Sequence, residues 1–324
     1  MRIITVEEHF EHPGVTARVG QLADPSSSVH TEPSYDRDSL ARLGGNRLTH
    51  MDAAGIDIQV ISHGNGSPGT LSSPEAVGLC RRVNDNLAAQ IAEYPNRFRG
   101  FATIPLYDAA AAAEELRRCV GDLGFVGVLV AGSYDGLFLD DPRFDPILAA
   151  AESVDLPIYI HPGPPPKSVV GRYYKGQWPL PIQLMFSGPA FGWHADAGIH
   201  VLRLILSGAL DRHPGLKLIS GHWGELAAFY LERLDGIFSR SNGCLARMPS
   251  DYYRSQVWIT PSGMFNRNQL AFMRAELGAD RILYAEDFPY LVHDNVSAFL
   301  EHSGLSGAEI HAIAHRNAES LLRL

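Results

Sequence analysis

The chain begins with the stretch Ile3-Ile4-Thr5-Val6-Glu7-Glu8-His9-Phe10, and this stretch decides the fold. It is a run of β-forming residues that ends in two carboxylates and an imidazole, where a dinucleotide-binding sheet would need a glycine-rich turn. Four later runs of β-formers also end in ligand-type residues: His63, His161, His222 and Asp287. Strand ends of this kind recur when parallel strands share one rim, because their carboxyl ends then face the same pocket.

Strand and helix patterns alternate along the rest of the chain. Further strand patterns lie at 58–61, 101–105, 126–130, 157–161, 216–220, 256–260 and 281–284, with helical patterns between them and a last helix at 307–324. Eight parallel strands separated by helices predict a (β/α)8 TIM barrel rather than an open doubly wound sheet. We expect residues 1–324 to form one domain, with an irregular insertion over the rim around 162–198.

Composition narrows the possible partners. The 324 residues carry 36 acidic and 27 basic side chains, a formal charge of −9 without a basic block, so a nucleic-acid partner is not expected. The longest apolar runs are too short to span a bilayer, and no membrane partner is expected. Three cysteines, far apart and odd in number, imply no disulfide framework. Without a recognisable targeting segment, the chain is expected to be cytoplasmic.

Candidate metal ligands lie at the strand ends. Glu7 and His9 are two apart, so they share one face of their strand and can chelate one ion, while Glu8 points the other way. His161 ends an apolar strand and is followed by a stiff Pro-Gly-Pro-Pro-Pro turn, although a hydrogen-bonded core histidine would give the same pattern. Asp287 follows the last strand, and alternation favours it over its neighbour Glu286 for the pore-facing position.

His222 and Glu225 form a separate element after the strand at 216–220. Three residues apart around a turn, the carboxylate can orient or charge the imidazole, which suits an acid/base role better than metal binding. Glu225 also fits a simpler role, as a first-turn acid that complements a helix dipole.

Together these motifs resemble the decarboxylase branch of the amidohydrolase superfamily, which includes γ-resorcylate, 2,3-dihydroxybenzoate and 5-carboxyvanillate decarboxylases. Many hydrolases of that superfamily begin with His-x-His, whereas this chain has Glu7 at the first position. No lysine closes the fourth strand, so a binuclear site with a carbamylated lysine is not implied. The resemblance covers nearly the whole chain and rests on Glu7-Glu8-His9-Phe10, Phe138–Pro146, Ile160-His161-Pro162-Gly163, Gly221-His222-Trp223-Gly224-Glu225, Glu286-Asp287-Phe288-Pro289 and Asn317-Ala318.

The resemblance implies nonoxidative decarboxylation of an ortho-hydroxybenzoate-like aromatic acid. It implies one divalent ion, zinc, manganese or magnesium, held by Glu7, His9, His161 and Asp287. In this reading Asp287 protonates the carboxylate-bearing carbon, and His222 with Glu225 supplies charge or a proton. Three further residues are expected to contact the substrate: Phe10, Arg233 and Phe288. A solvent-facing salt bridge is the alternative for Arg233.

The resemblance also implies a homo-oligomer, a tetramer or a dimer, and the apolar segment from Gly171 to Trp193 would suit an interface. Two other functions use the same ligands. One is a hydrolase that acts on a lactone or an amide, and the other is a non-catalytic barrel with a structural metal. The segments 63–69 and 192–196 depart from the family pattern and could line the pocket, so the substrate itself stays open.

Overall fold

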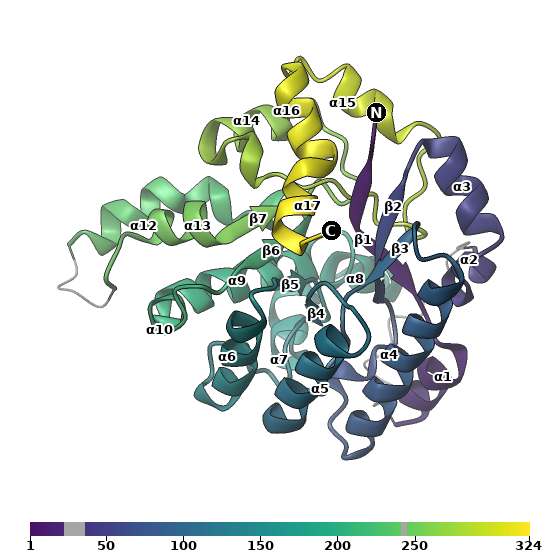
Figure 1. The fold of residues 1–324 in the computed structure, drawn as a ribbon. Coiled ribbons are helices and arrows are strands. Elements are labelled where there is room, and N and C mark those ends of the chain that lie inside the picture. The colour runs from purple at the N-terminus through teal and green to yellow at the C-terminus, as the bar shows by residue number, and fades with distance from the viewer. Residues whose placement is uncertain (23–35, 241–244) are drawn as a thin grey trace.

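The computed structural model describes residues 1–22, 36–240 and 245–324. Short parallel strands form the centre of the molecule, and helices surround them (Figure 1). The strands are β1 (Ile4–Phe10), β2 (Ile58–His63), β3 (Phe98–Gly100), β4 (Val128–Ala131), β5 (Ile158–His161), β6 (Leu218–Ser220) and β7 (Val257–Ile259).

The strands close into a ring. One parallel sheet runs β1-β2-β3 and a second runs β4-β5-β6-β7. Single bridges join them, from Ala102 to Val128 at one seam and through the segment 282–284 at the other. That segment pairs with both β7 and β1, since Leu283 N donates to Ile259 O at 2.8 Å and Val6 N donates to Tyr284 O at 3.0 Å. It occupies the eighth strand position, and the predicted barrel is confirmed.

The third strand lies earlier than expected. The apolar run 101–105 predicts a strand there, but β3 spans Phe98–Gly100 and only Ala102 of that run bridges β4. Pro105 has no N–H to donate to a ladder. Gly100 ends this strand, and a glycine is needed there because a Cβ would meet the Phe125 ring at 2.8 Å, a contact that the sequence does not reveal.

Helices and helical turns surround the ring and connect its strands. They are α1 (Pro13–Leu22), α2 (Arg37–Ala41), α3 (Asn46–Ala54), α4 (Glu75–Glu93), α5 (Ala109–Gly121), α6 (Asp145–Val154), α7 (Lys167–Val169), α8 (Leu180–Ser187), α9 (Gly192–Leu206), α10 (Ala209–Arg212), α11 (Gly221–Gly224), α12 (Leu231–Phe238), α13 (Pro249–Gln256), α14 (Arg267–Leu277), α15 (Val296–Glu301), α16 (Gly307–His311) and α17 (Asn317–Leu322). A π-helical segment, Ala312–Arg316, joins α16 to α17.

The insertion is shorter than expected. It contains α7, a π-helical turn at Val170–Tyr174 and α8, whereas residues 192–198, predicted as its end, already form the first turns of α9. Its apolar side chains are unusually open, and Tyr173, Leu180 and Met185 are 72%, 62% and 54% exposed.

Strand β1 carries a β-bulge that determines which side chains enter the barrel. Its pairing with β2 shifts between Thr5 and Glu8. Ile4 and Val6 belong to the inner hydrophobic cluster, so strict alternation would turn Glu7 and His9 outward. The bulge instead directs Glu7 inward after Val6, as bulges near active sites commonly do.

The buried histidine His200 on α9 makes the fold sensitive to acid. Its ring is 1% exposed, and its Nε2 accepts from Leu139 N at 3.0 Å. Burial lowers the pKa of His200 to about 3, whereas an unfolded chain has a histidine pKa of about 6.5. Below pH 6.5 the unfolded chain therefore binds a proton that the folded chain does not. The free energy of unfolding should fall by about 1.4 kcal/mol per pH unit from this group.

His200→Asn retains an acceptor for Leu139 N and removes this titration. Its Tm should decline less than that of the wild type between pH 7 and pH 5, measured by differential scanning fluorimetry. The exposed His311 provides the matched control, since His311→Asn should follow the wild-type decline. An equal or steeper decline in His200→Asn would contradict the assignment.

No helix within the described ranges is long and apolar enough to cross a membrane. Cys80 and Cys119 are buried free thiols, and Cys244 lies outside the described residues.

Candidate active site and metal centre

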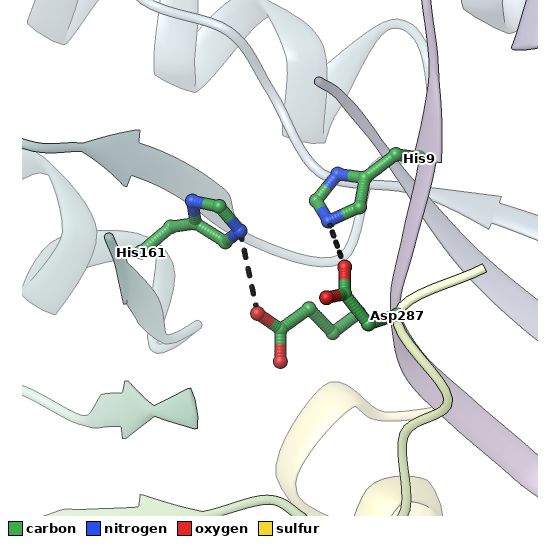
Figure 2. Close-up of side chains that lie close together, drawn as sticks. His9, His161 and Asp287 are labelled. Carbon is green, nitrogen blue, oxygen red and sulfur yellow. Dashed lines mark ion pairs between the residues drawn. The ribbon is translucent and has the colours of Figure 1, made fainter. Parts of the chain in front are cut away.

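The four predicted metal ligands meet at the carboxyl end of the barrel. Glu7 and His9 come from β1, His161 ends β5, and Asp287 follows the eighth strand position. One donor atom from each lies within 4.8 Å of the other three. His9 Nε2 faces Asp287 Oδ1 at 3.2 Å, and His161 Nε2 faces Glu7 Oε1 at 3.3 Å. Both imidazoles point toward the space beside Asp287 (Figure 2).

In both imidazoles the hydrogen bonds place the ring proton on Nδ1 and leave the lone pair of Nε2 facing this point. His161 Nδ1 lies 2.7 Å from Pro162 O, which can only accept, so Nδ1 carries the proton. His9 Nδ1 lies 3.0 Å from Ser62 Oγ, and that hydroxyl donates to Glu8 O at 3.4 Å, so His9 Nδ1 is also the protonated nitrogen. Both Nε2 lone pairs are therefore free to bind a cation.

One oxygen of Glu7 is held by three hydroxyl groups. Its Oε2 accepts hydrogen bonds from Tyr159, Ser262 and Thr260, the last at 3.2 Å. Its Oε1 is left for the cluster. Sequence reasoning missed these three groups, although Tyr159 shares a strand face with His161, and Thr260 and Ser262 stand at a strand end like the predicted ligands.

The donor set fits one divalent metal ion. Among the described residues, Glu7 Oε1, His9 Nε2 and Asp287 Oδ1 are buried without a hydrogen-bond partner, and buried polar atoms rarely stay unsatisfied. Burial raises the pKa of Glu7, so a cation would offset the cost of its charge. Burial lowers the pKa of His161 to about 3, which keeps this imidazole neutral and able to ligate. Two imidazole nitrogens and two carboxylates suit Zn²⁺ or Mn²⁺, and Mg²⁺ to a lesser degree.

Glu8 fixes the backbone that carries Asp287. It points away from the barrel interior, and its carboxylate accepts from the backbone N–H of Glu286 at 3.0 Å and of Phe288 at 2.7 Å. The side chain of Glu286 also turns outward, to His50 Nε2 at 2.9 Å and His293 N at 2.8 Å. The two acids thus face opposite ways, with Asp287 on the side of the metal ligands.

A buried arginine that the sequence did not single out supports this region. The guanidinium of Arg47 is fully buried and donates to the carbonyls of His9 and Ser39 and, at 2.9 Å, to Gln59 Oε1. Its charge compensates Glu8 and Glu286, both of which raise its pKa, although burial dominates and lowers that pKa to about 10. Its signal in the sequence, a lone arginine on an otherwise apolar helix face, is weak.

The His222–Glu225 pair forms as expected, on a left-handed turn. His222 Nδ1 and Glu225 Oε1 are 2.8 Å apart. Five consecutive residues, from His222 to Leu226, have φ between 45° and 74°, a conformation that costs a non-glycine residue about 1–2 kcal/mol. Backbone contacts to the end of β7 hold the turn, including Trp223 N to Thr260 O at 2.7 Å. Glu225 lies two residues before a 3-10 turn, Ala227–Tyr230, that leads into α12, so it is not a first-turn residue of that helix.

Electrostatics give His222 and Asp287 opposite charges. Burial opposes protonation of His222, but the nearby carboxylates of Glu225 and Glu7 raise its pKa well above the usual range. Burial alone would raise the pKa of Asp287, but the nearby imidazoles, with His222 first, outweigh burial and lower that pKa. His222 Nε2 lies 3.8 Å from Asp287 Oδ2.

The three predicted substrate contacts do not join this cluster. Phe10 alternates with His9 and is fully buried in the outer core beside the His63 ring. Phe288 is 3% exposed and stacks on His50, with ring centroids 4.3 Å apart. Arg233 is exposed on α12. Their contacts with a substrate stay predictions.

His194, to which the sequence gave no role, contacts the His222–Glu225 pair. Its Nδ1 lies 3.0 Å from Glu225 Oε2, and its ring centroid is 4.3 Å from that of His222. The only signal in the sequence was its place in the departing segment 192–196.

This barrel with a rim of histidines and carboxylates belongs to the amidohydrolase family, whose model matches residues 27–324. The chain is 36% identical to Decarboxylase orsB of Emericella nidulans, over 99% of this chain and 97% of that protein. It is 35% identical to gamma-resorcylate decarboxylase of Rhodococcus jostii, over 99% of this chain and 98% of that protein. The crystal structure of dihydroxybenzoic acid decarboxylase from Polaromonas sp. JS666, with bound manganese and the inhibitor 2-nitroresorcinol, has a TM-score of 0.86 and 32% identity, over 99% of this chain and 97% of that chain. The predicted family and its aromatic acid decarboxylase branch are confirmed.

Proposed function

We propose that this protein is a metal-dependent, nonoxidative decarboxylase of an ortho-hydroxybenzoate-like aromatic acid. The observation that carries the proposal is the convergence of Glu7, His9, His161 and Asp287 on one point, with His222 beside Asp287. The fourth strand ends at Ala131 rather than at a lysine, which favours one ion over a bridged pair. Relatives that match over almost the whole chain are decarboxylases of hydroxybenzoates, which favours this reaction over hydrolysis.

Asp287 is suited to two tasks in this reaction. Its Oδ1 belongs to the ligand set, and its Oδ2 remains on the side of His222. When bound, the divalent ion supplies a Lewis-acid anchor for the carboxylate and the ortho oxygen of the acid. Asp287 is ionised at rest, and we assign to it the transfer of a proton, taken up from the protonated His222, to the carboxylate-bearing carbon. The bond to the carboxylate then breaks, its electron pair returns to the ring, and carbon dioxide leaves.

Each turnover consumes one proton, which Asp287 must regain. His222 is the nearest proton-bearing group, and its Nε2 needs only a small movement from 3.8 Å to reach Asp287 Oδ2. Its partner Glu225 offsets the charge on the ring. A positioned acid/base group of this kind contributes about 10²–10⁴-fold to a rate.

The deciding experiment screens 2,6- and 2,3-dihydroxybenzoate and related ortho-hydroxy acids for carbon dioxide release, with lactones and amides alongside. Protein loaded with Zn²⁺, Mn²⁺ or Mg²⁺ should release carbon dioxide from at least one acid, and should carboxylate the matching phenol in concentrated bicarbonate. Hydrolysis of a lactone or an amide without decarboxylation of any acid would overturn the proposal in favour of a hydrolase.

We also propose that the protein assembles with itself, as a tetramer or a dimer. The insertion exposes several apolar side chains close together in sequence, a patch of the kind that subunit interfaces cover. They are Tyr173, Trp178, Leu180, Ile182, Met185 and Phe191. Light scattering at micromolar concentration should give a multiple of 35.4 kDa, and a monomer mass would contradict this. A cytoplasmic location is proposed as well, which the free thiols of Cys80 and Cys119 support.

A further inference from the structure

The carboxylate of Glu225 is divided between two imidazoles. Its Oε1 lies 2.8 Å from His222 Nδ1, and its Oε2 lies 3.0 Å from His194 Nδ1. The Glu225 side chain is only 1% exposed. A carboxylate can only accept, once ionised, so both Nδ1 atoms donate and both Nε2 atoms face away from Glu225. The two rings meet edge to face at 4.3 Å.

The second hydrogen bond determines where the first one points. A carboxylate held through one oxygen can rotate about its terminal bond, whereas one held through both oxygens keeps a single orientation. Glu225 gains little rigidity from regular structure, because it lies within the left-handed turn and not in a helix. The backbone of His222 is held by Ser262, since His222 N donates to Ser262 Oγ at 2.9 Å, whereas the direction of its ring depends on the Glu225 carboxylate.

His194 is itself fixed by its surroundings. It lies in the first turn of α9, where its Nε2 is 3.0 Å from Trp193 Nε1 and 2.9 Å from Pro189 O. With Nδ1 protonated, a neutral ring accepts from Trp193 and a charged ring donates to Pro189. Either form keeps its bond to Glu225.

We propose that His194 is a positioning residue for the reaction: it locks the Glu225 carboxylate and, through it, holds His222 Nε2 toward Asp287. The role in turnover rests on the proposed function, whereas the lock on Glu225 is a property of the structure alone. His194 does not belong to the set Glu7, His9, His161 and Asp287, so its loss should leave an ion held by those four residues in place, although its own donor atom lies within 4.8 Å of donors from His222 and Glu225.

The test compares three substitutions at this position. His194→Ala removes the ring, His194→Phe keeps its bulk without the donor, and His194→Asn places an amide N–H where Nδ1 stood. In the variants His194→Ala and His194→Phe, kcat should fall about 10- to 100-fold, as expected when a hydrogen-bonding partner behind an active-site residue is lost. KM should stay within about threefold, and bound metal should stay at the wild-type level. Asn should restore kcat to within a few-fold. The exposed His311→Ala is the matched control.

A second measurement is independent of activity. In crystals of His194→Phe grown with Mn²⁺ alone, the distance from His222 Nδ1 to Glu225 Oε1 should exceed 3.5 Å, against 2.8 Å here. An unchanged distance would overturn the inference, even if the wild type proved to decarboxylate no acid. Wild-type kcat in His194→Phe would overturn it as well, and so would an Asn variant as slow as the Phe variant.

Discussion

Asp287→Asn should lower kcat by about 10³-fold or more while metal and substrate still bind. The amide keeps an oxygen where Oδ1 faces His9 Nε2, so the ligand set survives in shape. It can neither deliver nor regain a proton, and loss of a positioned acid typically costs about 10²–10⁴-fold. Carbon dioxide release measures turnover, and titration with 2,6-dihydroxybenzoate measures binding.

A matched change nearby separates chemistry from folding. Asp294 is exposed on the segment after Asp287, so Asp294→Asn should keep wild-type kcat and metal content. If kcat of Asp287→Asn stayed within tenfold of the wild-type value, proton transfer would have to be assigned to another group. His222 would then be the first candidate, because it stands 3.8 Å from the same carboxylate.

His161→Ala and Glu7→Ala should each abolish tight metal binding and, with it, activity. Each change removes one of four ligands, and the loss of affinity should exceed the about 10- to 100-fold typical of changes behind the ligands. We expect wild-type protein to carry roughly one divalent ion per chain by elemental analysis, and either variant to carry far less after dialysis.

Exposed residues of the same type provide the controls, and His311→Ala and Glu301→Ala should retain the ion. Two ions per wild-type chain would contradict the mononuclear site. If His161→Ala kept its full metal content, His161 would instead be a hydrogen-bonded core histidine, the alternative that the sequence leaves open.

The barrel could be predicted because its signals are local. Runs of β-formers that end in ligand residues, separated by helical periods, reveal eight strand positions without knowledge of their packing. The third strand was misplaced because the apolar run 101–105 is the stronger local signal, whereas the fit of Gly100 against the Phe125 ring is a tertiary contact. The insertion was predicted to be too long because the sequence of residues 192–198 lacks a hydrophobic periodicity that would distinguish the first turns of α9 from a loop.

The ligand set could be predicted from the strand ends, but the bulge and the hydrogen bonds that position these ligands could not. Simple alternation places Glu7 and His9 on one face and does not say which face, and the bulge after Thr5 turns that face inward. His194 and Arg47 act through residues far away in the sequence, at separations of 31 residues to Glu225 and 38 residues to His9. Hydrogen bonds over such distances have no periodicity to detect.

The Glu8 contacts have a consequence for how the pocket could change over evolution. Glu8 binds backbone N–H groups of Glu286 and Phe288, not their side chains, so the bonds do not depend on which residues occupy those positions. Substitutions at positions 286 and 288 can therefore change the packing around His50, on which Phe288 stacks, while the carboxylate of Asp287 keeps its place. Such an arrangement separates two traits, the packing behind the site and the geometry of the site, that would otherwise have to vary together.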